Sequence, residues 1–295
     1  ATVASMSVVL SSAKSTASSL PAVSAVQSTQ DQIQNLMVQM NTALTANGAD
    51  YRVDYAEYLP PNDSGEIGQT VFFNDRGNRQ LNHHFVPGDP RRGGRTNITY
   101  IVDQAEGAID GLTVAQTTAA INRAMTTWES VNCSTIPVSS LPNVAGDIGV
   151  IEFLNGLGGS PFIFADLTHA GWLPAGILPN NVIAATFTFI FVSGPNPTDI
   201  DNNGKLDTAF REILYNNAFT WRINSNIDVE TVALHEAGHG LSQAHFGTAF
   251  RTNSNGVLHF APRAVMNAAY SGVQQHLAGT DNSGHCSIWA HWPNN

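Results

Sequence analysis

The sequence predicts an α+β fold, and three observations support this prediction. Segments with apolar residues at three- and four-residue spacings, which indicate helices, are mixed with short apolar or alternating runs, which indicate strands. The two kinds of segment do not follow the regular βαβ order of a parallel-sheet protein. The chain has 295 residues, of which 42% are hydrophobic, so it can form a sizeable core without help from its 2 cysteines.

The composition excludes some classes of partner. Charged residues make up 12% of the chain, about half the roughly 25% of an average soluble domain. The 13 basic and 23 acidic residues give a formal charge of −10, which argues against a nucleic-acid-binding surface. The longest apolar run, residues 182–192, is too short to span a bilayer. We therefore expect neither nucleic acid nor a membrane as a partner.

The first part of the chain contains one predicted helix and two strand candidates. Residues 1–29 are rich in serine, alanine and threonine, so we expect no fixed packed structure from them alone. Residues 30–47 are predicted to form a helix, and residues 51–58 and 70–73 are strand candidates. The apolar positions of the predicted helix are Ile33, Leu36, Met37, Met40 and Leu44.

A break in composition follows at residues 87–95, which read PGDPRRGGR. Segments that combine turn residues with basic residues are typically exposed and cleavable. We interpret this segment as the boundary between an N-terminal region, residues 1–92, which is a candidate propeptide, and a main domain, residues 93–295. An ordinary surface loop is the alternative interpretation.

The main domain is predicted to contain three helices and four strands. Residues 113–131 carry apolar side chains at helical spacing and predict a long helix. Asp228 can cap a second helix over residues 229–240, and the last helix is predicted between residues 280 and 289. The predicted strands are residues 97–103, 148–153, 163–172 and 182–192.

The most informative segment is residues 235–245, which read HEAGHGLSQAH. His235 and His239 are four residues apart, so on a helix both imidazoles lie on one face, where they can bind one ion. In a continuous helix His245 would lie about 15 Å along the axis from His235. Because zinc–nitrogen bonds are about 2.0–2.1 Å long, the chain must turn back before His245. Gly240 offers a place for the helix to end.

These residues match the requirements of a catalytic zinc site. Three histidines leave the fourth position of a tetrahedral zinc for water. A bound zinc lowers the pKa of that water and polarises a carbonyl group. Glu236, next to the first ligand, can take the proton from the water and pass it to the departing amine. The predicted reaction is metal-assisted amide hydrolysis without a covalent intermediate.

With this motif the sequence resembles the metzincin metalloendopeptidases, and among them the matrixins. That clan has a methionine turn beneath the zinc, and Met266 in the segment AVMN stands at a suitable distance downstream. Tyr270 stands where matrixins place a tyrosine that walls the specificity pocket. Residues 277–289 resemble the matrixin C-terminal helix, and the resemblance covers about residues 95–295.

The resemblance implies a fold and an activity. The implied fold is a metzincin-like α+β catalytic domain with a twisted mixed sheet, a long backing helix, an active-site helix and a C-terminal helix. The implied activity is that of a secreted, extracellular zinc endopeptidase that acts on proteins or peptides. Residues 167–170 resemble the edge strand of the matrixin cleft, to which an extended peptide can add through main-chain hydrogen bonds.

Several positions depart from the matrixin pattern. Ser242 stands where the clan has glycine, and a positive φ at a non-glycine residue costs on the order of 1 kcal/mol. Of the ligands to a second, structural zinc only His169 is recognisable, so we expect one zinc ion. No cysteine precedes Cys133, so the cysteine that blocks the zinc in matrixin zymogens is absent. If residues 1–92 are a propeptide, the candidate blocking groups are Asp50, Asp54, Glu57, Asp63, His83 and His84.

Residues 199–207 read DIDNNGKLD and resemble the first part of an EF-hand loop. Oxygen-bearing side chains stand at loop positions one, three, five and nine, and glycine stands at six. Position twelve is Phe210 instead of the bidentate glutamate, so the pattern predicts a structural calcium loop without the EF-hand helix pair. A solvated turn is the alternative. The predicted ligands are Asp199, Asp201, Asn203, the carbonyl of Lys205, and Asp207.

Two questions stay open from the sequence. Cys133 and Cys286 either form a disulfide, which would indicate an oxidising compartment, or remain two reduced buried thiols. The alternative functions are a non-enzymatic binding protein on the same scaffold and a zinc hydrolase of a non-peptide amide. The presence of Glu236 disfavours the binding protein, because such a module needs no general base.

Overall fold

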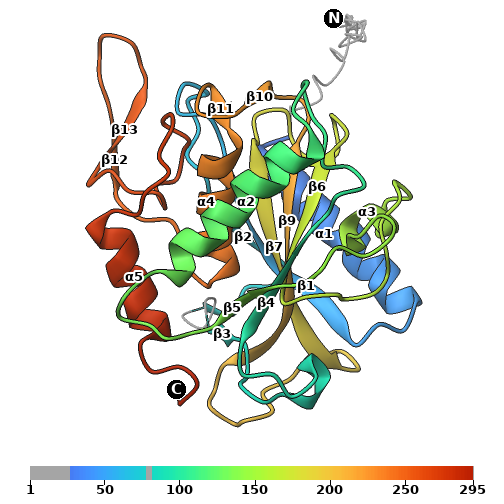
Figure 1. Ribbon diagram of the computed structural model, residues 1–295. Helices are drawn as coiled ribbons and strands as arrows, with labels where there is room; N and C mark the ends of the chain where they lie inside the picture. The colour runs from blue at the N-terminus through green and yellow to red at the C-terminus, as the bar shows by residue number, and fades with distance from the viewer. Residues whose placement is uncertain (1–26, 78–81, 295) are drawn as a thin grey trace, which may run out of the picture.

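The computed structural model describes residues 27–77 and 82–294 (Figure 1). Within these residues the protein is an α+β structure with a mixed sheet, and no described helix is both long and apolar enough to cross a membrane. Most of the segment 1–29 lies outside the described residues. The helices are α1 (Thr29–Ala46), the 3-10 turn η2 (Pro90–Arg92), α2 (Val114–Glu129), α3 (Val150–Leu154), α4 (Val229–Gly240) and α5 (Gly279–Trp289).

One large sheet organises the molecule. Its main path runs β2-β1-β7-β9-β6-β4-β5, with β3 paired to β9 and β8 paired to β7. β9, β6 and β4 are parallel neighbours, whereas β7 is antiparallel to both β9 and β1. The hairpin of β12 and β13 and the short ladder of β10 and β11 lie outside this sheet. The strands are β1 (Tyr51–Leu59), β2 (Thr70–Phe72), β3 (His83–His84), β4 (Ile98–Val102), β5 (Val138–Ser140), β6 (Leu167–Leu173), β7 (Ala184–Ser193), β8 (Asn196–Pro197), β9 (Leu206–Asn216), β10 (Trp221–Arg222), β11 (Ile227–Asp228), β12 (Thr248–Arg251) and β13 (Leu258–Ala261).

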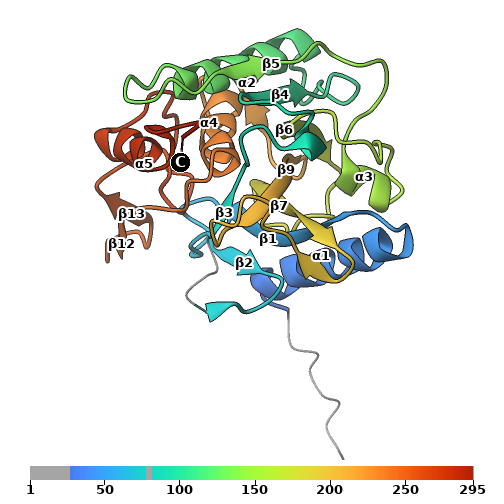
Figure 2. The same cartoon turned by 90° about the horizontal axis from the view of Figure 1, so that it is seen from below.

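Helices cover both faces of the sheet (Figure 2). Helices α2 and α4 lie on one face, where Trp128 and Leu234 join sheet residues in one buried cluster. Helices α1 and α3 lie on the other face, where Met37, Ile151 and Phe187 belong to a second cluster. The sheet therefore separates α4 from α1 and α3.

The long helices begin where the sequence predicts them, because each has a side chain that caps its first turn. Thr113 Oγ1 accepts a hydrogen bond from the backbone N–H of Gln116 at the start of α2. Asp228 accepts from the N–H of Thr231 at 2.9 Å at the start of α4. The predicted strands 51–58, 70–73, 97–103, 163–172 and 182–192 correspond to β1, β2, β4, β6 and β7.

The predicted strand over residues 148–153 is wrong, because most of this segment forms helix α3. The carboxylate of Glu212, on β9, accepts hydrogen bonds from the N–H groups of Val150 and Ile151 at 2.8 Å each. A residue 61 positions away in the sequence thus caps the helix, in place of a local side chain. No pattern within residues 148–153 can reveal that partner.

The sequence also missed β9 and misplaced the edge of the sheet. Strand β9 has 11 residues and lies at the centre of the sheet, between β7 and β6. Residues 167–170, expected to form the cleft edge strand, lie in β6, which has neighbours on both sides. The outer edge of β7 is paired along its length with β1.

Residues 87–95, the predicted boundary, are mostly exposed, but Asp89 and Arg92 are buried and anchor the segment in the fold. The Arg92 guanidinium is buried, where Nε donates to Asp166 and Nη1 donates to the carbonyl of Val86, both at 2.8 Å. The described part of residues 1–92 shares the large sheet with residues 93–295. Removal of a propeptide stays a prediction.

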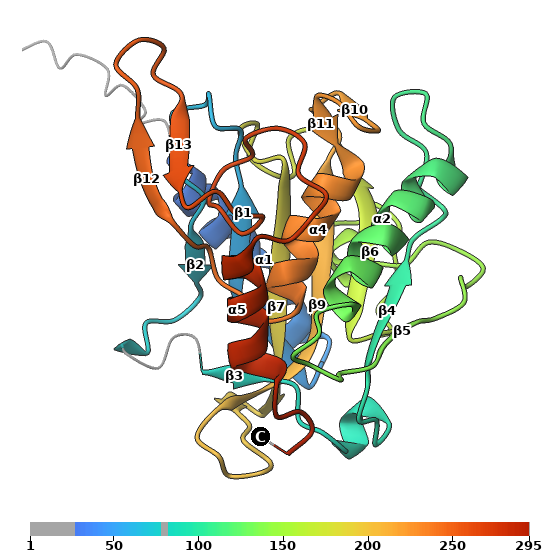
Figure 3. The same ribbon diagram turned by 60° about the vertical axis from the view of Figure 1, so that its left-hand side comes forward.

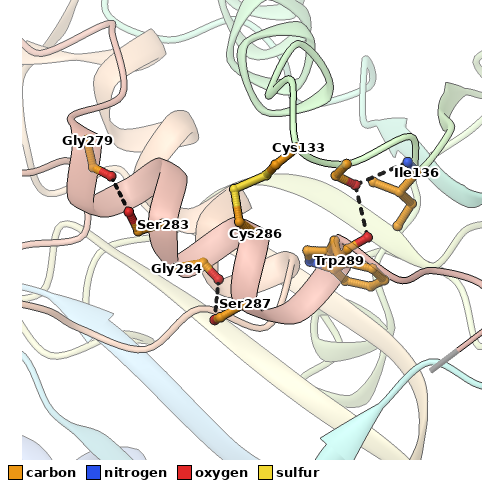
Figure 4. Close-up of a disulfide and its surroundings, with 9 residues drawn as sticks. Cys133, Ile136, Gly279, Ser283, Gly284, Cys286, Ser287 and Trp289 are labelled. Carbon is orange, nitrogen blue, oxygen red and sulfur yellow. Dashed lines mark hydrogen bonds between the residues drawn. A yellow bond between two sulfur atoms is a disulfide. The ribbon is translucent and has the colours of Figure 1, made fainter.

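The disulfide between Cys133 and Cys286 is present (Figure 4), with a Cα–Cα distance of 5.7 Å. It joins the segment that follows α2 to helix α5, across a sequence separation of 153 residues. Close by, the Ser134 hydroxyl donates to the carbonyl of Trp289 at 3.3 Å. Helix α5 is therefore fixed at its C-terminal half.

Candidate metal centre

The three predicted zinc ligands come together at the end of α4. His235 Nε2 lies 3.1 Å from His239 Nε2 and 3.3 Å from His245 Nε2, and His239 Nε2 lies 3.2 Å from His245 Nε2. Nitrogens bound to one tetrahedral zinc at about 2.0–2.1 Å are about 3.4 Å apart. The three atoms are thus spaced as ligands of a single ion, and the donor set fits zinc.

The other ring nitrogen of two of these histidines faces a carbonyl oxygen. His235 Nδ1 lies 2.7 Å from the carbonyl oxygen of Val265, and His239 Nδ1 lies 2.7 Å from that of Gln243. A carbonyl only accepts, so each Nδ1 carries the hydrogen and each Nε2 keeps its lone pair for a metal. Burial, followed by the nearby His239, lowers the pKa of His235 to about 3, so this ligand is neutral at ordinary pH.

A left-handed turn brings His245 back to the helix. Helix α4 ends at Gly240, and Ser242 has a φ of 69°. The N–H of Ser242 donates to the carbonyl of His239, and that of Gln243 donates to the carbonyl of Gly238, both at 2.9 Å. This pair of bonds is a Schellman motif with serine at its left-handed position. The turn therefore uses Ser242 where the matrixin pattern has glycine, and Gly240 stays helical.

Arg211 holds this end of α4 in place, which the sequence did not predict. Its buried Nη1 donates to the carbonyls of His239 and Gly240 at 3.0 and 2.7 Å and to the Ser242 hydroxyl at 2.8 Å. A positive group at a helix C-terminus is favoured by the helix dipole and satisfies carbonyls that lack intrahelical partners. The hydroxyl contact gives Ser242 a partner that glycine would not have.

Glu236 is placed as the sequence predicts, one residue after the first ligand. Its Oε2 accepts a hydrogen bond from the Thr186 hydroxyl on β7 at 2.6 Å, whereas Oε1 is buried without a partner among the described residues. Burial raises the pKa of Glu236 to about 7. A carboxyl group with that pKa can both accept and release a proton near neutral pH.

Met266 lies beneath the helix at the level of the histidines. A side chain added at Gly238, between the two ligands of α4, would collide with the Met266 sulfur. The Asp281 carboxylate accepts from the N–H groups of Val265 and Met266 at 2.9 and 3.1 Å. Helix α5, which carries Asp281, lies beside α4 (Figure 3) and so fixes both Met266 and the carbonyl that orients His235.

A carboxylate from the N-terminal part of the chain contacts the second ligand. Glu57, on β1, places Oε2 3.0 Å from His239 Nδ1. Burial opposes protonation of His239, but the charge and the hydrogen bond of Glu57 outweigh it and raise the pKa of His239. Among the candidate blocking groups, Glu57 thus reaches a ligand, but at the nitrogen that would not bind the metal. A carboxylate in this place orients a ligand.

Asp54, His83 and His84, three of the other candidate blocking groups, have their partners away from the three histidines. Asp54 pairs with His83 and Arg76, each at 2.5 Å. His84 lies 3.0 Å from the Asn203 amide. His83 therefore contacts β1, and His84 contacts the loop before β9.

The groove beside the metal centre holds residues 59–62. Leu59 is buried against the pocket formed by His235, Val265 and Tyr270, and the space left there is about 20 Å³. The N–H of Tyr270 donates to the carbonyl of Pro60 at 2.8 Å, and the N–H of Asn62 donates to the carbonyl of Tyr270 at 3.0 Å. Tyr270 and Leu59 thus both line a narrow pocket next to the centre, and the role of Tyr270 in specificity stays a prediction.

A larger cavity opens on the other side of Glu57. It has a volume of about 440 Å³ and is lined by Glu57, Gln243 and residues of the C-terminal segment, among them Trp289. The surroundings of the centre are therefore hollow on the side of α5 and β3.

The predicted calcium ligands are only partly brought together. Asp199 accepts from the N–H groups of Asn203 and Gly204, at 3.0 and 2.8 Å. Asp207 pairs with the Arg91 guanidinium at 2.7 Å and also accepts from the N–H of Ile200 in the loop at 3.0 Å. One oxygen each of Asp201 and Asp207 and one nitrogen of His84 lie within 4.8 Å of one another. Calcium in this loop stays a prediction, as does the count of one zinc. His169, the residue considered for a second zinc, is buried with Nδ1 2.8 Å from the Tyr215 hydroxyl.

Comparison with known proteins adds no family assignment. The chain matches no protein-family model, and no curated protein matches it.

Proposed function

We propose that this protein is a zinc-dependent endopeptidase, with His235, His239 and His245 holding the ion and Glu236 as general base and acid. The observation that carries the proposal is the convergence of three Nε2 atoms, 3.1 to 3.3 Å apart, directly beside a buried glutamate. Three histidine ligands leave a position open for water or substrate, which distinguishes a catalytic zinc site from a structural one.

The residues around the centre have separate tasks in the proposed reaction. A bound zinc would supply Lewis acidity, which lowers the pKa of water and polarises the peptide carbonyl. The free Oε1 of Glu236 takes the proton from the attacking water, and the carboxylic acid then gives it to the departing amine. Thr186 holds Oε2 and so keeps the carboxyl group in one orientation. Arg211 and Glu57 fix the end of α4 and the ring of His239.

The resemblance to the matrixins supports the same conclusion. Met266 lies under α4 and Tyr270 walls a pocket next to His235, which are the places that the resemblance implies. The disulfide between Cys133 and Cys286 is compatible with a secreted protein. Substrates would be proteins or peptides that extend along β7.

The described chain would be the closed form of this enzyme. An incoming peptide that adds to β7 needs the edge that β1 occupies, and a side chain entering the pocket of Tyr270 needs the space of Leu59. We infer that β1 and residues 60–62 must shift before a protein substrate can bind. The closed groove also favours the main alternative, a metal-binding protein without peptidase activity.

Hydrolysis of a quenched peptide library separates these functions. The experiment compares the wild type with Glu236→Gln, each loaded with zinc, and each also with Leu59→Ala to open the pocket. We expect both to bind zinc and Glu236→Gln to lose at least a hundredfold in turnover. Equal turnover by the proteins with and without Glu236→Gln would refute the role of Glu236. No turnover by any of the four proteins would favour a metal-binding protein without peptidase activity.

A further inference from the structure

A second group of possible metal ligands lies on the face of the sheet opposite α4. Asp103 follows β4, Asp147 precedes α3, and Glu152 belongs to α3. One carboxylate oxygen from each lies within 4.8 Å of the others. Calcium–oxygen bonds of 2.3–2.6 Å place oxygens on opposite sides of the ion about 4.6–5.2 Å apart. The spacing therefore suits a calcium ion.

Three of the six carboxylate oxygens in this cluster are buried without a hydrogen-bond partner among the described residues. Glu152 is 1% exposed, and neither of its carboxylate oxygens has a hydrogen-bond partner among the described residues. Asp147 Oδ1 is also buried and has no hydrogen-bond partner among the described residues. Burying an unpaired carboxylate is costly, so a buried glutamate with two free oxygens indicates a missing cation.

The surroundings add negative charge and no described positive group. The pKa of Glu152 is raised to about 10, first by burial and then by the nearby charges of Glu212 and Glu106. Within residues 27–77 and 82–294, no salt bridge involves any of these five carboxylates, namely Asp103, Glu106, Asp147, Glu152 and Glu212. Burial, followed by the contact with Asp147, likewise accounts for a pKa of about 7 at Asp103.

The backbone around the cluster is shaped for close approach. Gly149, Gly158 and Gly159 all have positive φ values, of 139°, 118° and 72°. A side chain at Gly158 would collide with Asp147 Oδ2, and the N–H of Gly159 donates to that oxygen at 2.6 Å. Two N–H groups also fix Asp103, since Ala105 donates to Oδ1 at 2.6 Å and Ile148 to Oδ2 at 3.1 Å. Asp103 and Asp147 are thus preorganised, whereas Glu152 is not held by any donor of the described chain.

We propose that Asp103, Asp147 and Glu152 form a calcium site that is separate from the zinc centre and from the loop at residues 199–207. Hard carboxylate oxygens select calcium over zinc, which prefers the imidazole nitrogens of the other centre. The bound ion would tie the end of β4 to α3. Its role is structural, and it does not depend on peptidase activity.

Calcium titration of metal-free protein, followed by calorimetry and thermal unfolding, tests the site. The Glu152→Gln protein is expected to lose one bound calcium, or at least tenfold in affinity for it. Its melting temperature without calcium should be higher than that of the wild type, because the wild-type carboxylate must take up a proton to be buried and glutamine need not. With calcium the order should reverse. A reversal in the order of the two melting temperatures would show that Glu152 binds calcium, because a residue with only a packing role would give the same order with and without calcium.

Matched variants keep the result interpretable. Asp147→Asn is expected to weaken the same calcium and provides a second reading if Glu152→Gln does not fold. Glu129→Gln, at an exposed position, and Asp201→Asn, in the loop at residues 199–207, should leave this calcium in place. Unchanged calcium stoichiometry and affinity in both Glu152→Gln and Asp147→Asn would overturn the proposal, as would a wild type that binds no calcium outside the loop.

Discussion

At the scale of single residues, adjacent charges on β9 serve two helices. Arg211 and Glu212 are neighbours on a strand, so their side chains point to opposite faces of the sheet. Arg211 binds the carbonyls at the C-terminal end of α4, and Glu212 binds the N–H groups at the start of α3. Each charge has the sign that the nearby helix dipole favours. Side chains of one buried strand thus set the ends of both helices.

The acidic cluster makes a prediction for pH dependence without metal. Burial, then Glu212, Glu106, Asp147 and Asp103, raises the folded-state pKa of Glu152 from 4.5 to about 10. A raised acid pKa means stability that is complete below about pH 4.5 and is lost as pH rises toward the folded value. Chelator-treated wild type should lose about 1 kcal/mol of unfolding free energy per pH unit, relative to Glu152→Gln, between about pH 7.5 and 9.5.

Urea unfolding at several pH values measures this difference. The two proteins share their other titrating groups, among them His239, so the difference between their slopes reports on Glu152. If the unfolding free energies of wild type and Glu152→Gln changed in parallel with pH, ionisation of Glu152 would not be the cause of the pH dependence. Added calcium should flatten the wild-type profile.

At the scale of elements, the end of α4 depends on one buried arginine. Arg211→Met keeps the approximate volume but removes the donors to His239, Gly240 and Ser242. We expect the unfolding free energy to fall by about 3 kcal/mol, because several buried acceptors lose a charged donor. Arg123→Met is the control, since Arg123 is 51% exposed and its pair with Glu230 contributes about 0–1 kcal/mol. Equal losses in the two variants would show that Arg211 is not a cap.

The elements that the sequence predicts correctly are those with local causes. Helix α4 begins at Asp228, whose side chain caps it, and its two histidines share a face through helical spacing alone. Helix α3 and strand β9 were missed because their causes are distant. The segment at residues 206–216 carries Asp207, Arg211 and Glu212 in an apolar run, and these charges find partners only in the folded protein. A charged pair inside an apolar run was the one signal available for Arg211.

At the scale of the whole molecule, strand order determines what covers the proposed metal centre. The sequence predicts β1 and β7 as strands, but pairing between segments over 120 residues apart has no local signature. In the structure the two strands pair, which places Glu57 against His239 and makes Leu59 part of the wall of the pocket that Tyr270 lines. The three histidines that converge, Glu236 and Met266 could be named from the sequence, whereas the pairing that covers the groove could not.

Leu59 tests whether the N-terminal strand closes the groove. Leu59→Ala should lower the unfolding free energy by about 2–4 kcal/mol, since a buried leucine is truncated. It should also raise peptide hydrolysis several-fold, because the pocket near His235 opens. Leu44→Ala is the matched control, being 2% exposed in the cluster of α1, away from the groove. Equal hydrolysis by the two variants would contradict the closure by β1.

The most direct test of the central claim is X-ray absorption at the zinc edge, on protein reloaded with one equivalent of zinc. We predict three nitrogen ligands at about 2.0–2.1 Å and one oxygen ligand. His245→Ala should retain zinc more weakly, with two nitrogen ligands. A wild type that takes up no stoichiometric zinc, or a His245→Ala spectrum identical to that of the wild type, would contradict the three-histidine centre.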